Sequence, residues 1–194
     1  MPADSPNEYY ISSEGKVFYW PAVPLAQWSE APVVSVSDVA VRLDGVSHVT
    51  LEGLTIAHAK TIGVSAIGVS HVVVSNCTVW GIGAKGVVLD DATHSALSGS
   101  HIYDTGCGGA VVSGGDFMTL QPGHNVASGN EIHDVCNYKR SYQPGLLWAG
   151  VGNNYSHNHL HNLPHNCILG GGNQGPGANN VRAATNCHHA SSDC

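Results

Sequence analysis

A short motif recurs five times in this sequence, and this recurrence limits the possible folds more than any other feature. The five copies are Leu54-Thr-Ile56, Cys77-Thr-Val79, Ser100-His-Ile102, Asn130-Glu-Ile132 and Asn158-His-Leu160. Their last residues are separated by 23, 23, 30 and 28 positions. A second apolar run follows each copy, at 64–67, 86–89, 109–112, 145–148 and 167–169. Each unit therefore holds two short predicted strands, which is too little chain for a βαβ crossover.

Units of this kind cannot bury their apolar side alone, so they must stack, with equivalent strands pairing in parallel along the stack. Successive coils of such a stack rise by about 4.8 Å. The sequence therefore predicts an all-β chain that forms a right-handed parallel β-helix (a solenoid) of about five to six coils. The last residues of the motif should form an inward apolar ladder. Asn130 and Asn158, two positions earlier, should form an inward amide ladder.

Three segments are expected along the chain. Residues 1–32 form an N-terminal segment in which 8–21 read as a hairpin turning at Glu14-Gly15. Residues 33–173 form the β-helix, with long loops near 116–123 and 137–144. Residues 174–194 are rich in Gly and Asn without an apolar period, which predicts an irregular, poorly ordered tail. The open ends of the stack predict self-association.

Charge and apolar content exclude several partners. The formal net charge is −7, with seven Lys and Arg that form no basic patch, so nucleic acid is not an expected partner. No apolar run approaches the roughly 20 residues that span a bilayer, and the first 30 residues lack the pattern of a signal peptide. Four of the six cysteines are spaced by 30, 29 and 31. Either a Cys107–Cys136 disulfide or buried free thiols would fit this spacing, which leaves the redox compartment open.

Four stretches carry a family resemblance. They are Glu8-Tyr-Tyr-Ile-Ser-Ser-Glu-Gly-Lys-Val-Phe-Tyr-Trp-Pro21, Val46-Ser-His-Val-Thr-Leu-Glu-Gly-Leu-Thr-Ile56, Ile102-Tyr-Asp-Thr-Gly-Cys-Gly108 with Ser113-Gly-Gly-Asp116, and Gly150-Val-Gly-Asn-Asn154 with His157-Asn-His-Leu-His-Asn-Leu-Pro-His165. The chain resembles right-handed parallel β-helix proteins of the pectate-lyase-like superfamily, and is most similar to those grouped with glycoside hydrolase family 141. The resemblance implies an extracellular protein acting on plant or algal polysaccharide. Members look longer at both ends, so the chain is expected to be truncated.

The outward positions beside the apolar ladder change along the stack from small residues to aromatic and titratable ones. Sugars stack on aromatic rings and form hydrogen bonds through their hydroxyls, so this strip predicts a polysaccharide-binding face. The predicted substrate-binding residues are Trp80, His101, Tyr103, His133, His159 and His161, together with Arg140 and Trp148. A merely solvated sheet face is the alternative interpretation.

Asp104 and Asp134 occupy equivalent positions in neighbouring coils, so their carboxyl groups are expected roughly 5 Å apart, as in a retaining glycosidase. Two carboxyls that close would have separated pKa values, giving one acid and one nucleophile. The alternative is that both aspartates cap turns. Asp116 and Glu131 are further catalytic candidates. Hydrolysis of glycosidic bonds is the first functional expectation, and a non-catalytic binding or structural β-helix is an alternative.

A polysaccharide lyase is the second enzymatic hypothesis. It would use Lys139 or Arg140 in the second long loop, and Ca²⁺ held by Asp90, Asp91 or Asp116. No cofactor is required for hydrolysis. His157, His159 and His161 alternate along one predicted strand, with Glu131 and His133 one coil away. They are therefore candidates for a metal site on a shared outer face, with exposed histidines that bond to their neighbours as the alternative.

Overall fold

The computed structural model describes residues 5–28, 31–170 and 182–189, in two compact units, Met1–Val34 and Ser35–Cys194. In the first unit, β1 (Tyr9–Ile11) and β2 (Val17–Tyr19) form an antiparallel hairpin, followed by the 3₁₀ turn η1 (Leu25–Gln27). Gly15 adopts φ of 77° in the connecting turn, a left-handed conformation that favours glycine. The hairpin predicted at 8–21 is confirmed.

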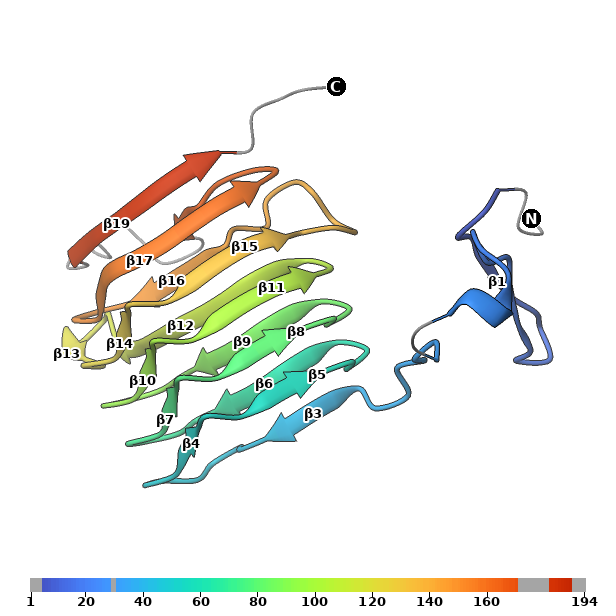
Figure 1. The fold of residues 1–194 in the computed structure, drawn as a ribbon. Helices are drawn as coiled ribbons and strands as arrows, with labels where there is room; N and C mark the ends of the chain where they lie inside the picture. The colour runs from blue at the N-terminus through green and yellow to red at the C-terminus, as the bar shows by residue number, and fades with distance from the viewer. Residues whose placement is uncertain (1–4, 29–30, 171–181, 190–194) are drawn as a thin grey trace. The chain divides into compact units, whose positions relative to one another are not determined.

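The second unit is a solenoid of parallel strands in three sets (Figure 1). The first set is β3 (Val39–Arg42), β6 (Ile62–Ile67), β9 (Lys85–Asp90), β12 (Gly108–Asp116), β16 (Leu146–Gly150) and β18 (Ile168–Gly170). The second is β4 (Thr50–Glu52), β7 (Val73–Ser75), β10 (Ala96–Ser98) and β14 (Val126–Ser128). The third is β5 (Thr55–Ala57), β8 (Thr78–Trp80), β11 (His101–Thr105) and β15 (Glu131–Val135). The long strand β17 (Asn154–Leu163) continues both the second and the third set.

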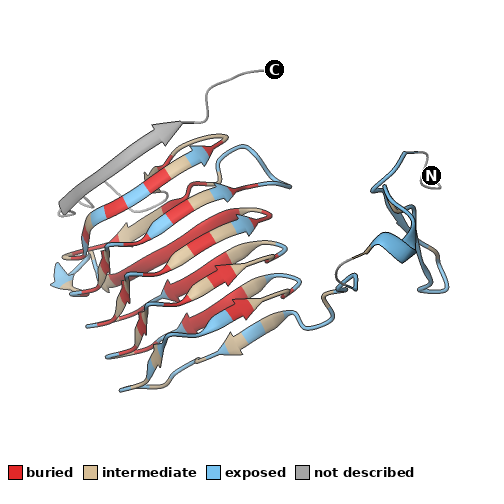
Figure 2. Cartoon of the chain, viewed as in Figure 1, coloured by how far each residue is buried: buried red, intermediate tan, exposed pale blue. Residues whose placement is uncertain are grey.

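The inward apolar ladder is present as predicted. Parallel pairing places Ile56 beside Val79, Val79 beside Ile102, Ile102 beside Ile132, and Ile132 beside Leu160. All five side chains belong to the hydrophobic core, and the buried residues follow the strands through successive coils (Figure 2). The all-β parallel β-helix predicted from the repeat is therefore confirmed.

Left-handed backbone corners separate the strands of each coil. Non-glycine residues with positive φ are mostly His, Asn and Asp, which tolerate this conformation better than other L residues. One row of corners lies between the second and third sets, at Gly53, Asn76, Gly99, Gly129 and His157. Another lies at the end of the third set, at His58, Gly81, Asp104, Asp134 and Asn162. These turn positions explain why the sequence places the same few residue types at equal points of each repeat.

The amide ladder predicted at Asn130 and Asn158 is also present. The side-chain amide of Asn130 donates to the side-chain oxygen of Asn158 at 2.9 Å, and both residues are buried. A second ladder, which the repeat pattern did not reveal, joins Asn125 to Asn153 at 3.0 Å in the same way. These amides satisfy buried backbone groups within the coils, so they hold neighbouring coils in register.

Two features differ from the sequence expectation. Each coil contains the additional short strand of the second set, because the chain between two corners is extended even where it covers only three residues. The tail was predicted to be irregular from 174 to 194, which was wrong for Arg182–His189: this segment forms strand β19 and pairs in parallel with β17. Its backbone adds to the sheet despite the lack of an apolar period. The rest of that predicted tail lies outside the described residues.

Both long loops occur where the repeat lengthens. After Asp116 the chain turns back, and β13 (Gln121–Pro122) pairs antiparallel with the end of β12. Residues 137–144 lie in the segment that connects β15 with β16.

Cys77, Cys107 and Cys136 are free thiols, so the Cys107–Cys136 disulfide is not formed. Cys167 is disulfide-bonded. In the described part of the chain, no helix has the length and hydropathy needed to cross a bilayer.

Candidate functional site

The outer face of the third strand set carries two adjacent rows of side chains. Residues two apart in a strand point to the same face, and parallel pairing aligns them from coil to coil. We call this surface the ring face, and it consists of Trp80, His101, Tyr103, Glu131, His133, His159 and His161. It brings together six of the eight predicted substrate-binding residues and the predicted catalytic residue Glu131.

Four rings in one row stack on one another along the solenoid. Trp80 and Tyr103 have centroids 6.2 Å apart with planes 5° from parallel, and Tyr103 and His133 are 5.4 Å apart at 3°. His133 and His161 continue the stack at 4.6 Å and 13°. All four side chains are half-buried, so one edge of each ring remains accessible. The result is a strip of aligned aromatic and imidazole groups across four successive coils.

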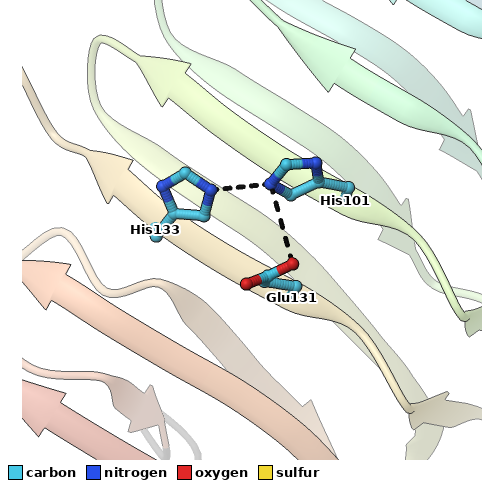
Figure 3. Close-up of side chains that lie close together, drawn as sticks. All are labelled: His101, Glu131 and His133. Carbon is cyan, nitrogen blue, oxygen red and sulfur yellow. Dashed lines mark hydrogen bonds and ion pairs between the residues drawn. The ribbon is translucent and has the colours of Figure 1, made fainter.

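Glu131 lies among four histidines. His101 Nε2 lies 2.6 Å from His133 Nε2 and 3.9 Å from Glu131 Oε2, and Figure 3 shows these three side chains pointing toward one another. On the other side of Glu131, Oε1 lies 3.3 Å from His161 Nε2 and 3.8 Å from His159 Nδ1. Two groups of three donors, both including Glu131, are therefore close enough to hold a metal ion.

These imidazoles further favour the charged form of Glu131. The hydrogen bond from His161 is the largest influence and lowers the pKa of the Glu131 carboxyl below its usual value. Desolvation opposes this effect, and the charges of His101 and His133 add to it. Glu131 is therefore a carboxylate at neutral pH, suited to act as a base, a nucleophile or a metal ligand rather than as a proton donor.

Asp104 and Asp134 occupy the corner that follows the ring face, at equal positions of neighbouring coils. Their φ angles are 50° and 47°. Asp104 Oδ1 accepts a hydrogen bond from the Asn137 side chain at 2.8 Å, whereas Asp134 Oδ2 lies 2.6 Å from His133 Nδ1. The structure thus places the two aspartates at equivalent positions and gives each a different partner. The contact with His133 connects Asp134 to the ring face.

A half-open pocket of about 440 Å³ adjoins this corner. Its lining comes from the end of β15, the following long loop and the end of β17: Asp134, Val135, Cys136, Asn137, Arg140, Asn162 and Pro164. Arg140 therefore lies near Asp134 rather than on the ring face itself. The pocket supplies one cation and one carboxylate beside the row of stacked rings.

The remaining acidic candidates lie elsewhere. Asp116 ends β12 in the first strand set and caps the turn after it, since its carboxylate accepts hydrogen bonds from the Met118 amide and the Thr119 hydroxyl, both at 2.8 Å. These bonds lower its pKa, the Thr119 hydroxyl most. Asp90 accepts a hydrogen bond from Ser113, and Asp91 occupies a left-handed corner. Among the described residues, none of the three belongs to a group of donors spaced to hold a metal.

Two other sequence interpretations need correction. Trp148 lies on β16 in the first strand set, where it pairs with the fully buried Val112 and packs against the core, so it is not part of the ring face. His157 was expected to share an outer face with His159 and His161, which is wrong. It occupies a left-handed corner with φ of 57°, and this corner breaks the alternation within β17.

Sequence reasoning missed a second row of histidines. His48, His71 and His94 stack with centroids 4.6 Å and 5.0 Å apart, and His124 continues the row at 5.0 Å from His94. All four occupy left-handed corners before the second strand set. Their spacings of 23, 23 and 30 match those of the repeat, so the signal was available in the sequence. This row contains no carboxylate, which distinguishes it from the ring face.

The stacked coils and their outer face define the protein as a parallel β-helix with a polar, ring-lined sheet. A family model described as "Right handed beta helix region" matches residues 33–158. The chain therefore belongs to the right-handed β-helix family. It has no match among curated proteins or among solved structures.

Proposed function

We propose that this chain is a carbohydrate-active β-helix protein that binds a polysaccharide along the ring face and hydrolyses its glycosidic bonds. The observation that carries the proposal is the stack of Trp80, Tyr103, His133 and His161. The exposed edges of these rings lie at regular intervals and can contact the apolar faces of successive sugar rings, while imidazole and carboxylate groups beside them can bind hydroxyls. An extended chain of sugars suits this face better than a small molecule, because the row crosses four coils.

Hydrolysis is assigned to the corner beside the ring face. Glycoside hydrolysis uses two carboxyl groups, about 5–5.5 Å apart in retaining enzymes. Asp104 and Asp134 follow one another on neighbouring coils, which are separated by about 4.8 Å. Asp134 also lines the pocket of about 440 Å³, which is large enough to admit part of a sugar chain. We assign catalysis to this pair and sugar positioning to the ring face.

Binding is tested by affinity electrophoresis of the full chain against a panel of neutral and uronate-containing plant and algal polysaccharides. Tyr103→Ala should weaken binding about tenfold, since losing one stacking ring costs on the order of 1–1.5 kcal/mol. Tyr138→Ala is the matched control, because Tyr138 is a loop tyrosine that is 87% exposed and lies outside the ring face. Equal binding by wild type and Tyr103→Ala would contradict the assignment of the ring face.

Catalysis is tested by the release of reducing ends. Asp104→Asn and Asp134→Asn should each lower the rate at least about 100-fold, because asparagine tolerates a left-handed corner but cannot transfer the proton. Asp91→Asn, a change at a left-handed corner on another edge of the coils, should have no effect. Binding without any product in the wild-type chain would overturn hydrolysis and leave a binding protein.

One observation favours a lyase as a second candidate: Arg140 and Asp134 line the same pocket. A cation there could hold the carboxylate of a uronate while a base removes the neighbouring proton. Elimination creates a carbon–carbon double bond, so ultraviolet absorbance of the product separates the two reactions. Product that absorbs, and that is lost in Arg140→Gln, would replace hydrolysis by elimination.

A further inference from the structure

The histidines around Glu131 are arranged more specifically than sugar binding requires. The strands β11, β15 and β17 contribute His101, the pair Glu131 and His133, and the pair His159 and His161. Each pair has the i, i+2 spacing that places both side chains on one face of a strand. Parallel register then puts Glu131 between His101 and His159 in its own row. Four imidazoles from three neighbouring strands therefore converge on one carboxylate.

The two oxygens of Glu131 face different histidine pairs. Oε2 is directed to His101 Nε2, which lies within 2.6 Å of His133 Nε2. Oε1 is directed to His161 Nε2 and His159 Nδ1, at 3.3 Å and 3.8 Å. When nitrogen or oxygen donors surround a zinc ion tetrahedrally at about 2.0–2.1 Å, any two donor atoms lie roughly 3.3 Å apart. These four separations, 2.6–3.9 Å, are within 1 Å of this value, and the donor atoms of each group all lie within 4.8 Å of one another.

A second observation concerns the far side of His133. Its Nδ1 lies 2.6 Å from Asp134 Oδ2. A carboxylate only accepts hydrogen bonds, so this contact keeps the proton on Nδ1 and leaves the Nε2 lone pair directed at His101. A metal-bound histidine usually donates its other ring N–H to a carboxylate in this way, which fixes the tautomer and the ring orientation. The His133 imidazole is thus oriented as a metal ligand would be.

We propose that the ring face holds two divalent transition-metal ions bridged by Glu131. His101, His133 and Oε2 of Glu131 bind the first ion; His159, His161 and Oε1 bind the second. Imidazole and carboxylate donors suit Zn²⁺ better than Ca²⁺ or Mg²⁺, which prefer oxygen ligands. Each ion has three protein donors and one open position toward solvent, as in catalytic rather than structural zinc sites. Asp134 acts as a positioning residue through His133.

The proposal is tested by calorimetric titration of the metal-free full chain with Zn²⁺, with no polysaccharide present, so its outcome is independent of the proposed function. The wild type should bind two ions per chain with micromolar or tighter Kd. Glu131→Gln keeps the shape of the side chain and should weaken both sites at least 100-fold. His101→Ala should remove the first site alone, and His159→Ala the second. Asp134→Asn should weaken the first site 10–100-fold.

His71→Asn is the matched control, since His71 belongs to the other histidine row and asparagine tolerates its left-handed corner. It should leave both sites unchanged, and circular dichroism should show the β-helix intact in every variant. If Glu131→Gln still binds either ion, or if His71→Asn loses as much zinc affinity as Glu131→Gln, the proposal is overturned. Either result would indicate adventitious binding of zinc to surface histidines. Binding of a single ion would overturn the bridging role of Glu131.

Discussion

Replacing Asn130 by alanine removes the centre of the buried amide ladder. The Asn130 side chain donates to the carbonyl of Leu97 at 3.0 Å and to the side-chain oxygen of Asn158 at 2.9 Å. Its own oxygen accepts a hydrogen bond from the buried Ser100 amide at 3.0 Å. Each lost bond costs about 1 kcal/mol when its partner stays buried. We therefore expect Asn130→Ala to lower the free energy of unfolding by about 3 kcal/mol.

The measurement is urea unfolding followed by circular dichroism, with the slope of the free energy against urea compared between variants. Asn137→Ala is the control, because it removes one exposed side-chain bond to Asp104 and should cost less than about 0.5 kcal/mol. Hydrogen exchange at the Ser100 amide should accelerate in Asn130→Ala. A loss under about 1 kcal/mol, or one equal to that of Asn137→Ala, would refute the view that these amides hold the coils in register.

Two further predictions concern titratable groups. Burial, with a smaller effect of Cys107, raises the pKa of the Cys136 thiol to about 11. At pH 8, iodoacetamide should therefore label Cys107 before Cys136, as followed by mass spectrometry. The reverse order would contradict the burial of Cys136. The lowered pKa of Glu131 means that its contribution to stability is present above about pH 4.5 and is lost as pH falls through the lowered value. In the presence of a metal chelator, Glu131→Gln should therefore reduce the free energy of unfolding more at pH 5.5 than at pH 3, and an equal effect at both pH values would be inconsistent with this linkage.

The repeat spacing was sufficient to predict the fold and the inward ladders. A parallel β-helix allows little variation in how equivalent strands pair, so aligning Val79, Ile102 and Ile132 in the sequence also aligned them in space. The same alignment predicted the outward rows, because alternation along a strand determines which side chains share a face. The short strands of the second set were missed, since three residues between two corners give too little pattern to detect.

For the candidate site, the sequence predicted which residues lie near one another but not which face of the solenoid each side chain occupies. His157 and His159 look alike in the sequence, yet the corner at His157 separates it from the ring face. Trp148 has an aromatic side chain of the type that binds sugars, but its position in β16 directs it toward the core. The backbone conformation at the corners decides both cases, and a pattern of residue types does not specify where within a loop such a corner falls.

The sequence by itself determined which residues occupy equal positions in successive coils, because strand spacing and side-chain alternation leave almost no freedom once the repeat is known. Only the tertiary structure decided which atoms meet: that the two oxygens of Glu131 face separate histidine pairs, and that Asp134 contacts His133 rather than Asp104. These contacts depend on side-chain rotation and on the left-handed corners. Both are set by packing between coils that are distant in the sequence.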